Sequence, residues 1–223
     1  MFITLEGIEG SGKTTQVEHI SRFLQSKGVD LTVTREPGGT TIGQKIRTIL
    51  LDPQSDEMNP ATELLLYTAD RAQHIRQVIL PALEAKKVVL CDRYFDATLV
   101  YQGYARGIDI PTIRELHRLM CGGLSPDLTL LFDLPPEEGL SRAWRQIHTG
   151  ERTGNEARFE KETVDFHRKV RQGYLELARS EPGRFQLIDA TRREESVRKQ
   201  VLSILTRRLL EPNGYGTRKS EKN

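Results

Sequence analysis

The sequence contains little cysteine and no long apolar run. Its two cysteines, Cys91 and Cys121, offer no disulfide framework and no zinc-ligand spacing. His117 stands four residues before Cys121 on an expected helix, which supplies half of a metal site at most. No apolar segment reaches membrane-spanning length, and the N-terminus lacks the basic and then apolar layout of a signal peptide. We therefore expect a cytoplasmic protein with reduced thiols and no membrane partner.

Neither sign of charge dominates the chain. Lys and Arg number 33 against 31 Asp and Glu, which gives a formal net charge of +2 and no broad face for nucleic acid. Internal repeats and low-complexity linkers are also missing, so we expect a single domain over residues 1–210. Residues 211–223 are polar, rich in turn formers and without periodicity, which is typical of a disordered tail.

Short apolar runs alternate with helical patterns along the whole chain. This alternation predicts an α/β fold with a parallel sheet and helices on both of its faces. Five runs are expected to be strands: FITLE (2–6), DLTVTRE (30–36), VVLCD (88–92), DLTLLFDL (127–134) and FQLIDA (185–190).

Capping residues and apolar periodicity predict the helices between these strands. The first begins near Lys13 and ends at Gly28, and the third is capped by Asn59, with Pro60 in its first turn and a bend or break near Pro81. Another helix follows EPGGT, and its apolar face includes Ile42 and Ile46. The other helices are expected at 95–106, 111–121, 136–148, 159–180 and 194–210.

A glycine-rich motif directly follows the first expected strand. GIEGSGKT, residues 7–14, fits the pattern G-x-x-x-x-G-K-[ST] of a phosphate-binding loop. Its glycines allow backbone N–H groups to turn toward anionic oxygens, Lys13 reaches the β- and γ-phosphates, and the Thr14 hydroxyl is a Mg²⁺ ligand. A glycine-rich turn that binds nothing is the alternative. The expected nucleotide-binding residues are Gly7, Ile8, Glu9, Gly10, Ser11, Gly12, Lys13, Thr14 and Thr15.

Charged residues at two other places suit a second phosphate. Asp92 follows a buried strand, where it can organise Mg²⁺, and the adjacent Arg93 can clamp a phosphate; a helix cap and a surface arginine are the alternative. Arg47 and Arg71 lie in helices expected to face the same crevice. Tyr67 shares a helical face with Arg71, and a ring beside a guanidinium suits a nucleobase. The alternative is that Tyr67 is a core residue and Arg71 a solvated charge.

An arginine-rich segment joins two expected helices. Residues 142–158 contain Arg142, Arg145, Arg152 and Arg158 around a polar loop, which suits a flap that brings cations to a moving phosphoryl group and excludes water. A solvated charged loop is the ordinary alternative.

Together these motifs resemble the bacterial thymidylate kinase family. The resemblance is carried by FITLEGIEGSGKTTQ, TREPGGT, VVLCDRYFDATLVYQGYARG and PDLTLLFDL, and it covers all but the tail. It implies a P-loop kinase fold with a helical flap, transfer of the γ-phosphate of ATP to dTMP to give dTDP and ADP, Mg²⁺, and a homodimer.

The resemblance also implies roles for individual residues. Glu9 faces the acceptor sugar, Arg47 and Arg93 grip the acceptor phosphate, and Tyr67 stacks on thymine where the family usually has Phe. Arg71 bonds a thymine carbonyl, Thr98 and Gln102 lie at the polar edge of the base, and Tyr101 lies against the deoxyribose. The catalytic set is then Lys13, Asp92, Arg93, Arg152 and Arg158, with Thr14 and Asp92 at the metal.

Three other functions fit parts of the sequence. Another nucleoside or nucleotide kinase shares the donor motif, and a regulatory nucleotide switch shares it too, although the guanine-reading N-K-x-D run is missing. The basic C-terminal helix could bind nucleic acid or membrane, but its apolar residues are better explained by packing on the sheet.

Overall fold

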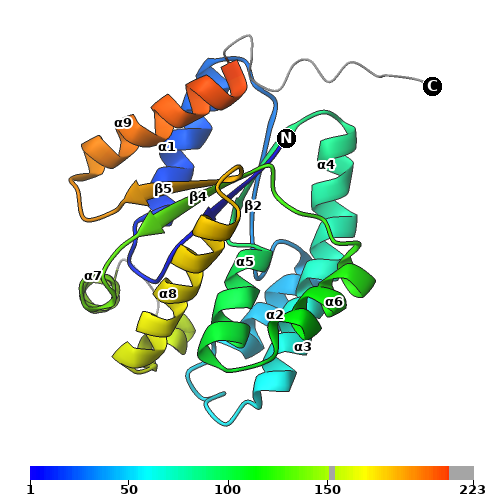
Figure 1. Ribbon diagram of the computed structural model, residues 1–223, viewed down its shortest axis with the longest axis vertical. Helices are drawn as coiled ribbons and strands as arrows, with labels where there is room; N and C mark the ends of the chain where they lie inside the picture. The colour runs from blue at the N-terminus through cyan, green and yellow to red at the C-terminus, as the bar shows by residue number, and fades with distance from the viewer. Residues whose placement is uncertain (151–153, 211–223) are drawn as a thin grey trace.

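The computed structural model describes residues 1–150 and 154–210 (Figure 1). Within these residues, five parallel strands form one sheet in the order β2-β3-β1-β4-β5. All five lie where the apolar runs predict them, so the predicted α/β fold with a parallel sheet is confirmed. The strands are β1 (Phe2–Glu6), β2 (Leu31–Arg35), β3 (Val88–Asp92), β4 (Leu128–Asp133) and β5 (Phe185–Asp189).

The central strands are apolar because both of their faces are covered. Ile3 and Leu5 of β1, Leu90 of β3 and Leu130 of β4 are fully buried, as expected for a parallel sheet between two helical layers. In Figure 1, α8 crosses in front of the sheet and α1 lies behind it, and α1 packs against α9. The predicted placement of helices on both faces is therefore confirmed.

Most helices begin and end near their predicted residues. None of those in the described part of the chain is long and apolar enough to cross a membrane. The helices are α1 (Lys13–Ser26), α2 (Thr41–Leu51), α3 (Pro60–His74), α4 (Leu80–Glu84), α5 (Phe95–Thr98), α6 (Ile110–Cys121), α7 (Pro136–His148), α8 (Val164–Ser180) and α9 (Glu194–Leu205).

Three helices continue into π-helical turns, which the apolar periodicity does not predict. They cover Ile75–Ile79 between α3 and α4, Leu99–Ala105 after α5, and Thr206–Leu210 after α9. Pro81 therefore stands in the first turn of α4, and the change of helix type precedes it. Asn59 caps α3 as predicted, because its side chain accepts a hydrogen bond from the Ala61 N–H at 2.8 Å.

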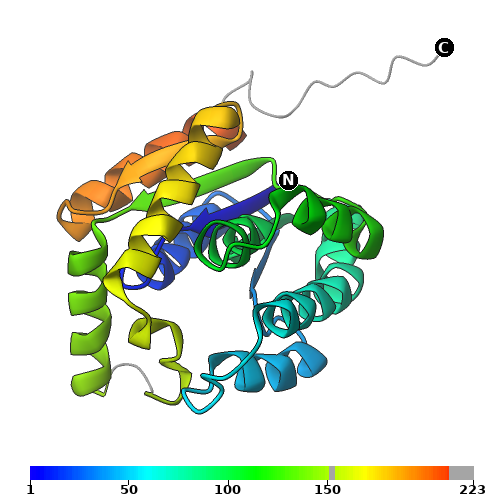
Figure 2. The ribbon, with the colours of Figure 1, turned by 60° about the horizontal axis from the view of Figure 1, so that its bottom comes forward.

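The predicted helix over 159–180 begins too early. Only a single 3₁₀ turn forms at Phe159–Lys161, and α8 starts after Thr163, whose hydroxyl accepts from the Phe166 N–H at 3.2 Å. A hydroxyl at this position accepts a hydrogen bond from a backbone N–H at the start of the helix. This capping signal fixes where α8 begins more strongly than the apolar residues before Thr163 do. The segment before α8 therefore turns back toward α2, and in Figure 2 it lies between the lower ends of α7 and α8 and helix α2.

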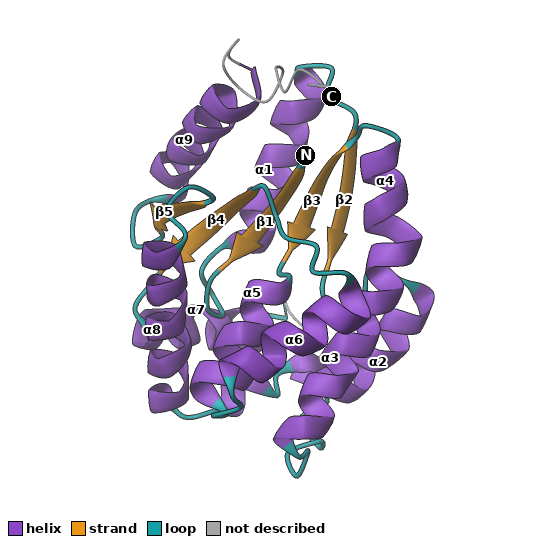
Figure 3. Cartoon of the chain, turned by 45° about the vertical axis from the view of Figure 1, so that its right-hand side comes forward, coloured by secondary structure: helices purple, strands orange, loops and turns teal. Residues whose placement is uncertain are grey.

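The carboxyl ends of the strands meet along one edge, which locates the site. The register pairs Asp92 of β3 with Leu5 of β1 on one side and with Arg35 of β2 on the other. In Figure 3 the arrowheads point toward the half of the molecule that contains α2, α3, α5 and α6. Ligands of open parallel sheets bind at such an edge.

Candidate active site

The phosphate-binding loop connects β1 to α1 and needs its glycines. Gly7, Gly10 and Gly12 have positive φ angles of 139°, 70° and 85°. A Cβ on Gly7 would stand 2.5 Å from the Phe132 carbonyl oxygen, and one on Gly10 would collide with the carbonyl oxygen of Gly139. The loop thus packs its backbone against β4 and α7 at a distance that only glycine permits.

Lys13 lies within this loop and is nearly buried. Its Nζ donates hydrogen bonds to the carbonyl oxygens of Gly7 and Ile8, at 3.0 and 2.8 Å, and to the Ser11 hydroxyl at 3.2 Å. Burial lowers the pKa of Lys13 to about 8, and the nearby Arg93 acts in the same direction. The ammonium group is therefore held at the loop, and an anion bound beside it would stabilise its charged form.

Asp92 and Thr14 occupy the edge between the loop and β3, and both line the cavity. One carboxylate oxygen of Asp92, Oδ1, is buried and accepts no hydrogen bond from the described residues. Those residues contain no group of three His, Cys, Asp or Glu side chains able to hold a metal ion alone. An unsatisfied oxygen beside an exposed hydroxyl fits a cation that takes its other ligands from phosphate and water.

Glu9, in the phosphate-binding loop, is held by three side chains from other elements and lines the cavity. Its Oε1 accepts hydrogen bonds from Arg93 at 2.8 Å and from the Tyr101 hydroxyl at 2.7 Å, while Nδ1 of His167 lies 3.3 Å from Oε2. Arg93 also lies over the Tyr101 ring, 5.2 Å from its centroid. Although burial opposes ionisation, Arg93 and His167 hold the pKa of Glu9 far below its ordinary value, so the carboxylate is charged.

Arg93 has an unusual backbone conformation for its residue type. Its φ angle is 67°, in the left-handed region, which costs about 1–2 kcal/mol for a residue other than glycine. Its N–H donates to the Leu5 carbonyl oxygen at 3.0 Å, and the next residue, Tyr94, donates its N–H to Glu6 at 2.8 Å. The chain thus bends sharply just after β3, and Arg93 faces the phosphate-binding loop.

Arg71 forms the opposite wall together with its partners. It is 2% exposed; its Nε donates to Glu36 at 2.8 Å and one terminal nitrogen donates to the Thr98 hydroxyl at 2.9 Å. Glu36 is held on its other oxygen by Nδ1 of His74 at 2.9 Å. Since a guanidinium only donates, this wall offers fixed donors to whatever enters.

Tyr67 and Gln102 complete this wall. Both line the cavity, and burial raises the pKa of the Tyr67 hydroxyl above its ordinary value, so that it stays protonated. Gln102 is 1% exposed and belongs to the π-helical turn that also contains Tyr101. Tyr67, Arg71, Thr98, Tyr101 and Gln102, which the sequence assigns to the substrate, all line the cavity, and their contacts with a substrate stay predictions.

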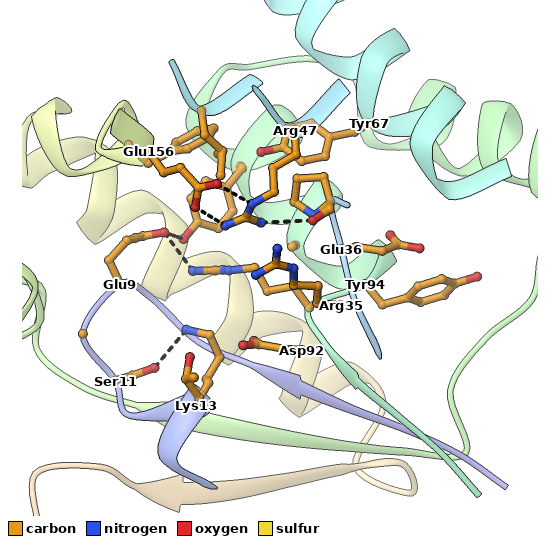
Figure 4. Close-up of a pocket in the computed structure, with 18 of the residues that line it drawn as sticks. Glu9, Ser11, Lys13, Arg35, Glu36, Arg47, Tyr67, Asp92, Tyr94 and Glu156 are labelled. Carbon is orange, nitrogen blue, oxygen red and sulfur yellow. Dashed lines mark hydrogen bonds and ion pairs between the residues drawn. The ribbon is translucent and has the colours of Figure 1, made fainter. Parts of the chain in front are cut away.

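Arg47 reaches the same space from α2. It forms two hydrogen bonds with Glu156, at 2.9 and 2.6 Å, and a third with the Pro37 carbonyl oxygen at 3.0 Å. Figure 4 shows this pair at one wall of the cavity and Lys13 at the other.

The three arginines of the predicted flap that the structure describes have different surroundings. Arg142 donates to the Ala190 carbonyl oxygen at 3.1 Å, Arg145 is exposed, and Arg152 lies outside the described residues. Arg158 is 5% exposed, and its guanidinium donates to the carbonyl oxygens of Leu50 and Ser55 and to Glu63. All three nitrogens of its guanidinium hold the segment before α8, and Arg158 is not among the residues that line the cavity, so its predicted catalytic contact stays a prediction.

One cavity of about 600 Å³ contains both groups of residues. The phosphate-binding residues Gly10 to Thr15 lie on one side, and Tyr67, Arg71 and Gln102 lie on the other, while Gly7 and Ile8 contribute backbone carbonyls to Lys13 from beneath. The arrangement can hold two ligands, an anionic one and a planar one with acceptor groups, with arginines between them.

Several cavity residues were missed by the sequence reasoning. Arg35 is exposed and lines the cavity beside Asp92, and Glu36, Glu156, Phe159 and Glu160 line it too. Arg35 could have been found, because it lies near the carboxyl end of a predicted strand, as Asp92 does. Glu156 and Glu160 carried no such signal, since their approach depends on how the segment before α8 folds.

The chain has clear relatives among known proteins. The profile of the thymidylate kinase family matches residues 5–201. The chain belongs to this family. It is 55% identical to the thymidylate kinase of Desulfosudis oleivorans over 207 residues, which cover 93% of this chain and 97% of that protein. It is 50% identical to the thymidylate kinase of Geotalea uraniireducens over 210 residues, covering 94% and 98%.

A solved structure of the same family shares the fold. The crystal structure of thymidylate kinase from Ehrlichia chaffeensis superposes with a TM-score of 0.74 at 32% identity, and the match covers 92% of this chain and 98% of that one. The family resemblance seen in the four sequence blocks is therefore confirmed.

Proposed function

We infer that the cavity holds both substrates of one reaction, in which the γ-phosphate of ATP passes to dTMP and gives dTDP and ADP. Membership of the thymidylate kinase family is the general support. The observation that carries the inference is the joining, in a single cavity, of the phosphate-binding loop with a wall of fixed donors and an aromatic ring. A loop that only bound and hydrolysed a nucleotide would not need the second wall.

The donor half is the loop and the start of α1. Backbone N–H groups and the positive end of the α1 dipole favour the β- and γ-phosphates of ATP. Lys13 exchanges its present carbonyl acceptors for phosphate oxygens, a stronger pairing because both partners are charged.

Magnesium is part of the proposal, with Thr14 and Asp92 as the residues that hold it. The unsatisfied Oδ1 of Asp92 supports this assignment. When bound, Mg²⁺ supplies positive charge to the phosphate oxygens. The residues of the chain do the rest: they orient the two phosphates and neutralise the acceptor.

The acceptor half places the base against α3 and the π-helical turn. Tyr67 stacks on the thymine ring, and Arg71 donates to its carbonyl oxygen at position 4. Thr98 and Gln102 lie at the polar edge of the base, and Tyr101 lies beside the deoxyribose, fixed by its bond to Glu9.

Arg93 and Arg47 grip the acceptor phosphate between the two halves. One phosphate oxygen of dTMP attacks the γ-phosphorus in line with the departing ADP, without a covalent enzyme intermediate. This phosphate monoester is already ionised near neutral pH, so no general base is required. Arg152 remains our candidate for the cation that arrives at the transferring group, while Arg158 is assigned to anchoring.

A homodimer and a cytoplasmic location are also proposed from family membership. Helices α3 and α6 pack together, and Leu65, Leu119 and Met120 on them are each 57% exposed. An apolar surface of this kind suits a second copy of the chain. Sedimentation at micromolar concentration is expected to give the mass of a dimer. The mass of a monomer would contradict the proposed homodimer.

The proposed reaction is tested by whether ADP formation depends on the acceptor. The purified chain with ATP and Mg²⁺ is expected to form ADP at least about 100-fold faster when dTMP is added, with one dTDP for each ADP. Lys13→Met is the matched control, and it is expected to abolish both products while dTMP still binds. ADP formation at the same rate with and without dTMP would favour the nucleotide-switch alternative.

A further inference from the structure

Glu63 of α3 joins the base-binding wall to the segment before α8. Its side chain is fully buried, and its two oxygens accept hydrogen bonds from three residues. Gln102 donates its amide nitrogen at 2.8 Å, Arg158 donates at 2.6 Å, and Arg106 donates twice at 3.3 Å. The two guanidinium groups stabilise the carboxylate form, which can only accept hydrogen bonds.

This carboxylate determines which end of the Gln102 amide faces the cavity. A glutamine amide has a donor end and an acceptor end, and the two have almost the same shape. Because Glu63 accepts only, the NH₂ group must point toward it. The carbonyl oxygen Oε1 is then the end left for a ligand, and Gln102 lines the cavity.

The orientation matters because pyrimidine bases differ at this edge. Thymine and uracil carry a proton on N3 and an oxygen at position 4, whereas cytosine has an unprotonated N3 and an amino group at position 4. An acceptor from Gln102 beside a donor from Arg71 complements the first pattern and opposes the second. Leaving such buried polar groups unpaired gives strong rejection of the wrong ligand.

We propose that Glu63 is a positioning residue for base selection: it holds the Gln102 amide with its carbonyl oxygen toward the base, so that the site takes an N3-protonated pyrimidine and rejects cytosine. The proposal rests on the function proposed above. It does not require contact between Glu63 and the substrate, since Glu63 is absent from the cavity wall and acts through Gln102.

Glu63→Gln is the variant that tests this role. The new amide can either accept from Gln102 or donate to it, so Gln102 can turn its NH₂ group toward the base. The ratio of kcat/KM for dTMP to that for dCMP is expected to fall about tenfold, the effect of one misdirected hydrogen bond to a base. Arg158 keeps its two carbonyl acceptors and Arg106 keeps Glu162 at 2.6 Å, which supports folding of the variant.

Two controls separate positioning from general damage. Glu162→Gln removes the other partner of Arg106 and leaves Gln102 untouched, so its dTMP to dCMP ratio is expected to equal that of the wild type. In a Gln102→Ala background, Glu63→Gln is expected to change the ratio less than about twofold, because the amide through which it acts is gone.

Two results would contradict the proposal. One is an equal loss of kcat/KM for dTMP and dCMP in Glu63→Gln. The other is that Glu63→Gln lowers the dTMP to dCMP ratio as much in the Gln102→Ala background as in the wild type. Wild-type protein supplies a second measurement if Glu63→Gln does not fold. dTMP methylated at N3 lacks the proton that Gln102 accepts, so it is expected to react at least about 100-fold less efficiently than dTMP. Efficient reaction of the methylated substrate overturns the proposal. If the wild-type protein forms no product that depends on dTMP, the proposed function itself is contradicted.

Discussion

His167 Nδ1 lies 3.3 Å from Glu9 Oε2, and its other ring nitrogen, Nε2, lies 2.9 Å from the Phe159 carbonyl oxygen. Both neighbours only accept hydrogen bonds, so both ring nitrogens donate only when the imidazole is protonated. Although burial lowers it, the hydrogen bond and charge of Glu9 raise the pKa of His167 above its ordinary value. The His167 side chain thus links α8 to the phosphate-binding loop and to the segment before α8.

This relationship makes stability depend on pH. Because the pKa of His167 is higher in the folded chain than in the unfolded one, its stabilisation is complete below the unfolded pKa, near 6.5, and is lost as pH rises through the folded pKa. His167→Gln is expected to lower the free energy of unfolding by about 2 kcal/mol at pH 6 and by less at pH 9. Urea titrations at both pH values measure this. A loss of stability that grew with pH would contradict the protonated form.

Lys13 gives a second pH effect, on ATP binding. The pKa of Lys13 is about 8 in the ligand-free chain, and phosphate charge beside the ammonium raises it in the complex. ATP binding is therefore expected to take up almost no proton at pH 7 and up to about one proton near pH 9, with weaker affinity as pH rises above 8. Calorimetry in two buffers of different ionisation enthalpy counts the protons. Lys13→Met should bind ATP without this uptake, and equal uptake in both proteins would contradict the assignment.

Arg71 is expected to act on the acceptor and not on the donor. Arg71→Ala removes the fixed donor to the base and leaves the buried Glu36 paired only with His74. The KM for dTMP is expected to rise about 100-fold while the KM for ATP changes less than about threefold. Steady-state kinetics with each substrate varied in turn gives both values. Equal losses for the two substrates would argue against a contact with the base.

Arg158 is expected to contribute to stability and not to the chemical step. Arg158→Met leaves Glu63 buried with one fewer charged partner, which costs about 3–5 kcal/mol of folding free energy. At a temperature where the variant is folded, kcat is expected to fall less than about tenfold, against at least about 1000-fold for Lys13→Met. A stable Arg158→Met protein with kcat as low as that of Lys13→Met would restore Arg158 to the catalytic set.

The fold could be predicted from the sequence because its signals are local. Each strand is a short apolar run, and helix starts carry their own caps, as at Asn59 before α3. The π-helical turn at Leu99–Ala105 gave no sequence signal, since its surroundings include α8, which comes from a distant part of the chain. The start of α8 was misjudged because Phe159 reads as a helical apolar residue but is held in a separate turn.

The candidate site was predictable where a motif fixes a residue at the end of a strand. Gly7 to Thr14, Asp92 and Arg93 all follow that rule. The role of Arg158 could not be predicted. In the sequence, an arginine of a charged loop gives the same pattern whether its side chain faces the substrate or a buried carboxylate. Glu63 gave no sequence signal for the same reason: its partners Gln102 and Arg158 come from distant parts of the chain.

The identity of the acceptor is the central claim, and it is best tested by supplying ATP and Mg²⁺ with dTMP, dUMP, dCMP, UMP, CMP or thymidine in separate reactions and quantifying the phosphorylated product. The account predicts dTDP from dTMP with the highest kcat/KM, little product from dCMP and none from thymidine. A clear preference for another monophosphate would leave the phosphate-binding loop in place and contradict the assignment of Tyr67, Arg71, Thr98 and Gln102 to thymine.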